Sequence, residues 1–270
     1  MLALLGNVVL IAYACATGLS LAYLVQREEI VHRLASLATL AGWIAHSIVL
    51  IALVVETGRP PLGGLPQAVS TAVWVVVLLM MLVERQYKMP ALGAFVLPVV
   101  VILSLKASAA RPAALEQIGL AFRGAWVWVH IALAMIGIAA FVLNFAGAVM
   151  YLLQERTLKA KRTGAFYYRL PDLQTLDRLT YRTLALGFPF LTTGLILGVV
   201  WARTAWGSVL TFDPLASLSF VAWVIYAATL AGRAVAGLHG RRAAYFAVFG
   251  FGVLVLTLGA GFFLPGRHGT

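Results

Sequence analysis

The sequence predicts an all-α fold, a polytopic membrane bundle of about eight transmembrane helices that forms one integral-membrane domain over residues 1–270. Of the 270 residues, 62% are hydrophobic and only 11% are charged, which is too little polar surface to cover a soluble globule of this size. The apolar runs are continuous rather than alternating, and this favours helices over the strands of an outer-membrane barrel.

Eight apolar segments approach the length of about 20 residues that a helix needs to cross a hydrocarbon core ~30 Å thick. The predicted spans are residues 2–25, 34–55, 68–83, 91–106, 125–153, 183–202, 215–236 and 242–264. The third and fourth are short and the fifth is long, differences that helix tilt absorbs. No basic stretch precedes the first run, so we interpret it as a transmembrane helix rather than a cleaved signal peptide.

The basic residues predict the orientation of the helices. Of the 20 Lys and Arg residues, 14 lie in the first, third, fifth and seventh connections, and 6 lie in the other connections and the C-terminal tail. By the positive-inside rule, the odd connections are cytoplasmic and both termini lie on the outer side. The net charge of +11 is thus explained by helix orientation and does not indicate nucleic-acid binding.

The fifth connection, residues 154–182, is the largest and carries seven of these basic residues. We interpret it as a solvated collar that faces lipid headgroups, with docking of a cytosolic partner as the alternative. His32 and His239 lie in basic cytoplasmic connections and are expected to be solvated or to contact headgroups. The single cysteine, Cys15, lies within the first span and forms neither an internal disulfide nor a CxxC pair.

Two distant histidines are predicted to lie at the same membrane surface. His130 lies near the outer end of the fifth helix, His268 follows the eighth helix, and the loop from Trp201 to Pro214 opens at the same face. Imidazole pairs are good axial ligands for haem iron, and aromatic rings suit the flat macrocycle. The alternative is that His130 is an interfacial hydrogen-bonding residue and that His268 belongs to an unstructured tail.

His46 lies near the middle of the second predicted helix, where a polar side chain is costly and faces the bundle interior or a functional cavity. One interpretation is a second haem site or a residue on a substrate path. The other is an interhelical hydrogen bond to a residue such as Asn144, Thr192 or Thr193.

Between Leu176 and Pro214, a basic segment is followed by an apolar stretch long enough to cross a membrane and then by a loop that contains tryptophan. Four other stretches contribute to the same resemblance: Glu84–Pro98, Trp126–His130, Gln154–Lys159 followed by Leu170-Pro171, and Phe263–His268. Together these stretches resemble the cytochrome c assembly membrane proteins of CcsA type and their haem-biosynthesis-linked HemX-type relatives. The resemblance covers most of the chain.

The resemblance implies a haem, because two histidines flanking the tryptophan-rich external loop are thought to ligate one in that family. The matching residues are His130 and His268, which would be the axial ligands of a non-covalently held haem b. Trp201, Trp206 and Asp213 match the loop pattern and are expected at this cofactor, together with Phe212, which departs from that pattern. Asp213-Pro214 is also expected to cap the seventh helix.

The chain departs from the family's pattern at several positions. Two tryptophans and a Lys-Glu pair of the loop are missing, and the position of an inner histidine is Ala231. These departures favour the HemX-type eight-helix branch with a degenerate tryptophan-rich loop.

The resemblance implies a multi-pass protein of the bacterial inner (plasma) membrane that handles haem for cytochrome c biogenesis and holds it at the outer face. Expected partners are membrane lipid, a second cytochrome c assembly subunit and apocytochrome c, and no nucleic acid. We expect an assembly factor rather than an enzyme, since synthase activity would require the partner subunit. The alternative is a non-enzymatic regulatory or scaffold membrane protein linked to tetrapyrrole synthesis or another membrane complex. A small-molecule transporter is a third interpretation.

Overall fold

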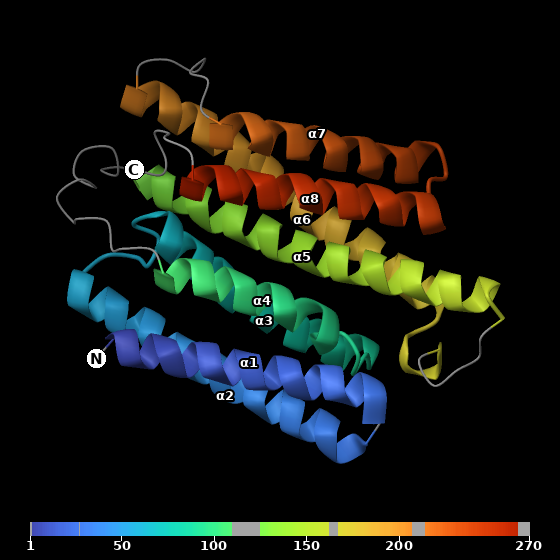
Figure 1. Cartoon of the computed structure of the whole chain (residues 1–270). Helices are drawn as coiled ribbons and strands as arrows, with labels where there is room; N and C mark the ends of the chain where they lie inside the picture. Colours follow the sequence, from blue (N-terminus) through green and yellow to red (C-terminus); the bar gives the residue numbers. More distant parts are fainter. Residues whose placement is uncertain (1, 27, 110–124, 162–166, 207–213, 264–270) are drawn as a thin grey trace.

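The structure is a computed structural model that describes residues 2–26, 28–109, 125–161, 167–206 and 214–263, and every regular element within these ranges is a helix. The helices run up and down through one bundle (Figure 1). They are α1 (Leu2–Gln26), α2 (Glu29–Thr57), α3 (Leu65–Tyr87), α4 (Gly93–Ala109), α5 (Ala125–Lys159), the short 3-10 helix η1 (Tyr167–Arg169), α6 (Leu173–Trp206), α7 (Pro214–Val235) and α8 (Gly240–Phe263). The predicted all-α polytopic bundle is confirmed.

Seven of the described helices are long and apolar enough to cross a membrane. The exception is α4, which has 17 residues and contains Pro98. At 1.5 Å per residue it extends for about 25 Å, slightly less than the hydrocarbon core.

The predicted fifth connection, residues 154–182, is too long. Helix α5 continues to Lys159 and α6 already begins at Leu173, so most of the segment is helical. Asp172 caps α6, because its two carboxylate oxygens accept hydrogen bonds from the Thr175 backbone N–H at 2.8 Å and from the Thr175 hydroxyl at 2.7 Å. The end of an apolar run indicates where a helix leaves the bilayer. The helix itself continues to its capping residue, which can lie several residues further along the chain.

The predicted loop from Trp201 to Pro214 is also shorter than expected. Helix α6 runs through Trp206, since no Gly or Pro interrupts the chain after Trp201 and Arg203 in the last turn suits the negative end of the helix dipole. Helix α7 begins at Pro214, the predicted first-turn proline. The predicted capping residue Asp213 lies outside the described residues.

Helix α5 occupies the centre of the bundle. It packs most extensively on α6, which runs antiparallel to it, and also contacts α3, α4 and α8. Small residues let the α5 and α6 backbones approach closely: a Cβ added at Gly137 would lie 3.1 Å from the Leu191 nitrogen. One added at Gly187 would lie 3.0 Å from the Ala140 Cβ.

Asp177 joins α6 to the end of α7 and the start of α8. Its Oδ2 lies 2.8 Å from Nη2 of Arg233, and its Oδ1 accepts a hydrogen bond from the Gly240 N–H at 3.0 Å. The Arg233 side chain is only 6% exposed. Because Arg233 is buried, this partly buried ion pair benefits from additional hydrogen bonds that offset its desolvation, and the Gly240 N–H supplies one.

Several side chains near the helix ends make contacts within the chain while they remain at least partly exposed. Arg169 donates to the Val25 carbonyl at 2.6 Å, and Arg182 donates to the Tyr87 hydroxyl at 2.8 Å. His32 was expected to face solvent or headgroups, but its Nδ1 lies 3.6 Å from Oε1 of Glu84. Two basic side chains of the fifth connection thus contact neighbouring helix ends and remain partly or fully exposed. That this segment faces lipid headgroups stays a prediction.

Helix α1 begins and α8 ends at the same end of the bundle (Figure 1). The start of α5, the end of α6 and the starts of α3 and α7 lie there too, and we call this the His130 end. That this end faces outward stays a prediction.

Candidate functional site

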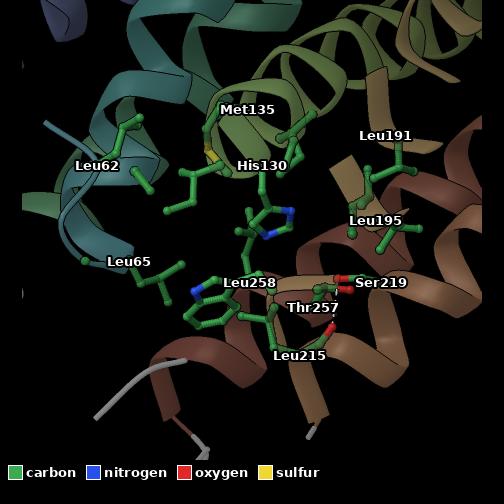
Figure 2. A pocket seen from close by; sticks show the side chains of 17 residues that line it. Leu62, Leu65, His130, Met135, Leu191, Leu195, Leu215, Ser219, Thr257 and Leu258 are labelled. Atoms are coloured by element: carbon green, nitrogen blue, oxygen red, sulfur yellow. Dashed lines mark hydrogen bonds between the residues drawn. The ribbon is translucent and has the colours of Figure 1, made fainter. Parts of the chain in front are cut away.

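A cavity of about 170 Å³ lies at the His130 end, between α3, α5, α6, α7 and α8. Figure 2 shows the imidazole of His130 among side chains from these helices. Its walls are mainly apolar and include Leu65, Met135, Trp201, Leu215 and Thr257. A concave apolar site with a few polar groups is the usual form of a small-molecule site.

His130 is half-buried on α5, and its Nδ1 lies 2.6 Å from the carbonyl oxygen of Gly194 on α6. A carbonyl oxygen only accepts, so in the neutral ring Nδ1 carries the hydrogen and Nε2 carries the lone pair. Histidines that bind metals show this arrangement: one ring N–H donates to a carbonyl, which fixes the tautomer and the orientation of the ring.

The structure brings two of the predicted site residues together. Trp201 lines the same cavity as His130 and is only 8% exposed. Trp206 ends α6, but its side chain lies outside what the structure describes. Phe212, Asp213 and His268 also lie outside the described residues, although α8 ends five residues before His268 at the same end of the bundle.

His46 is not part of this cavity. It lies buried on α2 and is 3% exposed, with Nδ1 at 3.2 Å from the Tyr13 hydroxyl on α1 and Nε2 at 2.9 Å from the Ser70 hydroxyl on α3. Its ring therefore links three helices through hydrogen bonds.

The partners predicted for His46 were wrong. Helix α2 packs on α1 and α3, whereas Asn144 belongs to α5 and Thr192 and Thr193 belong to α6. An interhelical hydrogen bond is present, but it is made within the first three helices.

Sequence reasoning missed most of the cavity wall. Leu62 and Leu65 come from the second connection and the start of α3, and Ser219 and Thr257 come from α7 and α8. These residues have no distinctive spacing, because tertiary packing alone brings them together.

The residues of the cavity fit a haem, because they provide an iron ligand, His130, and an apolar wall. The cavity volume limits how much of the haem enters. Small-molecule sites measure roughly 300–1,000 Å³, so a cavity of about 170 Å³ admits only part of a macrocycle. A neutral imidazole whose second nitrogen is hydrogen-bonded suits iron, and Trp201 suits a flat aromatic ring.

Comparison with known proteins identifies relatives along most of the chain. A cytochrome c biogenesis protein CcsA from Pyropia yezoensis is 28% identical over 276 residues, covering 88% of this chain and 86% of that protein. The protein of the same name from Prochlorococcus marinus (strain MIT 9515) is 30% identical over 235 residues, covering 78% of this chain and 75% of that protein.

The solved structure of the cytochrome c heme lyase CcmF resembles the fold with a TM-score of 0.69 at 21% sequence identity. The likeness covers 96% of this chain and 46% of that chain, so this protein spans less than half the length of CcmF. A family model described as cytochrome C assembly protein matches residues 62–267. This range contains α5 with His130 and α6 with Trp201. Because the match covers most of the chain, the protein belongs to the cytochrome c assembly protein family.

Proposed function

We propose that this multi-pass membrane protein handles haem for cytochrome c biogenesis and holds it at the His130 end of the bundle. The observation that carries the proposal is the imidazole of His130, which lines an apolar cavity and has its Nδ1 committed to the Gly194 carbonyl. The names of the similar proteins support the pathway: CcsA is a cytochrome c biogenesis protein and CcmF is a heme lyase.

In this proposal His130, through Nε2, and His268 would hold the haem iron. The haem is a non-covalently held haem b, whose iron accepts two imidazole nitrogens when bound. Trp201, which lines the cavity, would provide an aromatic surface for the macrocycle. Trp206, Phe212 and Asp213 are proposed to complete the site from the end of α6 and the segment before α7.

The chain's own task is to bind and orient. Its single cysteine, Cys15, belongs to α1. In this proposal the cysteine thiols that become attached to the haem belong to apocytochrome c. Holding a reactant in a fixed orientation accounts for a large share of the rate of such a reaction. We therefore propose an assembly factor whose synthase activity requires a second assembly subunit and apocytochrome c. We place it in the bacterial inner membrane, in the HemX-type branch, with the His130 end outward.

The test is the absorption spectrum of the purified protein. We expect substoichiometric haem b with a low-spin spectrum typical of two imidazole ligands, and His130→Ala and His268→Ala should each shift or remove it. The matched control is His239→Ala, because His239 is exposed in the turn between α7 and α8 at the opposite end.

Unaltered spectra in both His130→Ala and His268→Ala would exclude the proposed ligand pair. A protein that never retains haem would favour the regulatory or scaffold alternative.

A further inference from the structure

We propose that Gly194 and Gly198 on α6 are positioning residues for His130, which fix the orientation and the tautomer of its ring. The inference rests on the proposed function in one respect, namely that Nε2 of His130 is an iron ligand. The geometry of the ring against α6 holds whether or not haem binds.

Gly198 provides the space for the imidazole. A Cβ added at this position would lie 2.7 Å from Cε1, 3.0 Å from Nδ1 and 3.4 Å from Nε2 of His130. Contacts under 3.0 Å to a Cβ essentially do not occur. The edge of the ring therefore occupies the space that a side chain at position 198 would need. Only glycine lets the imidazole lie this close to α6.

Gly194 provides the hydrogen-bond acceptor one turn earlier on the same face of α6. Its carbonyl lies 2.6 Å from Nδ1 of His130, and its Cα faces the backbone of Ala134, where an added Cβ would lie 3.3 Å from the nitrogen. A side chain at 194 would press the two helices apart and lengthen the hydrogen bond. The absence of a side chain therefore sets the distance between carbonyl and ring.

The two glycines act on different properties of the same ring. The Gly194 carbonyl determines which nitrogen carries the hydrogen, and the open surface of Gly198 determines where the ring plane lies. A ring moved away from Gly198 would lose the hydrogen bond to Gly194, because both contacts involve the edge that contains Nδ1 and Cε1. Orientation and tautomer are thus coupled.

Glycines in the same interface provide a control for packing alone. A Cβ added at Gly187 would lie 3.0 Å from the Ala140 Cβ and 3.1 Å from Cε1 of Phe141, which is a comparable crowding of α5 against α6 away from His130. Gly187→Ala is therefore the matched control for Gly198→Ala. Gly252→Ala on α8, with nothing within 4 Å of the added Cβ, controls for the substitution itself.

The first measurement uses the haem-free protein in detergent, labelled with ¹⁵N-histidine. The His130 signals are assigned by their absence in His130→Ala. We expect Nδ1 to be protonated and Nε2 to be unprotonated in the wild type. Gly198→Ala should shift both signals, and the milder Gly194→Ala should shift them less. Gly187→Ala and Gly252→Ala should leave them in place. Unshifted His130 signals in Gly198→Ala would overturn the inference.

The second measurement is a titration with haem b. Loss of a group that orients a metal ligand typically weakens binding by about 10- to 100-fold, and we expect a loss of this size in Gly198→Ala. Excess free imidazole should restore its low-spin spectrum, because it replaces the displaced ring. Wild-type affinity in Gly198→Ala would also overturn the inference.

The two proposals fail in different ways. A wild-type protein that binds no haem refutes the proposed function, and the ¹⁵N signals then decide alone whether the glycines position His130. If Gly198→Ala does not fold, the smaller crowding in Gly194→Ala decides through the same signals.

Discussion

Replacing His46 with leucine tests whether this residue holds helices together or belongs to a path for haem. His46→Leu replaces the imidazole with an apolar side chain of comparable bulk and removes the hydrogen bonds to the Tyr13 and Ser70 hydroxyls. The ring is not part of the His130 cavity, so we expect a change in stability and none in haem binding.

The magnitude follows from the two bonds. An interhelical hydrogen bond in a membrane protein contributes about 0.6 kcal/mol, so the loss of both lowers the free energy of unfolding by about 1.2 kcal/mol. Tyr13→Phe and Ser70→Ala remove one bond each and should each lower it by about 0.6 kcal/mol. Because Tyr13 and His46 share a bond, Tyr13→Phe combined with His46→Leu should destabilise by less than the sum of the single changes.

The assay is reversible unfolding in mixed detergent micelles, combined with haem content per folded molecule. A fall in haem content in His46→Leu, with unfolding behaviour unchanged, would refute the structural role and favour a haem path. Equal unfolding curves for His46→Leu and the wild type would show that the two bonds contribute nothing measurable.

Two further predictions concern the cap of α6 and the orientation of the bundle. The hydrogen bonds from Thr175 lower the pKa of the Asp172 carboxyl, so its stabilisation is complete above the unfolded-state value of about 3.9 and is lost as pH falls through the lower folded value. Asp172→Ala should lower the free energy of unfolding by about 0.5–2 kcal/mol near neutral pH. Asp172→Asn should keep most of the cap and remove its pH dependence. Identical profiles of unfolding free energy against pH for the wild type and Asp172→Asn would contradict this. Single cysteines at Ser208 and Thr163, in a Cys15→Ser background, should react with an impermeant maleimide from opposite sides of the membrane, and labelling of both from one side would exclude the predicted orientation.

The order and number of helices could be predicted because continuous apolar runs have few other solutions in a bilayer. Helix ends could not be predicted from apolarity. The start of α6 is set by the cap at Asp172, and its end lies past Trp201 because no glycine or proline occurs between Trp201 and position 207. Polar side chains at helix ends, such as Arg169, contact neighbouring helices that the sequence does not place.

The candidate site was predictable in part. His130 and Trp201 lie near the adjacent ends of α5 and α6, so topology alone brought them together. The partners of His46 were missed because a histidine in the middle of a span gives no indication of which helices surround it. Gly198 was missed because its importance lies in what the opposite helix presents to it.

The hairpin of α1 and α2 stands apart from the candidate site. All the residues that line the cavity fall between Leu62 and Leu258, within the stretch that the family model matches, and the hairpin packs on α3 and α4. Substitutions at its lipid-facing positions, including ones that would suit a bilayer of different thickness, should therefore leave the cavity unaltered. The exception is the contact formed by Tyr13, His46 and Ser70, where a change on one helix must be matched on the other two.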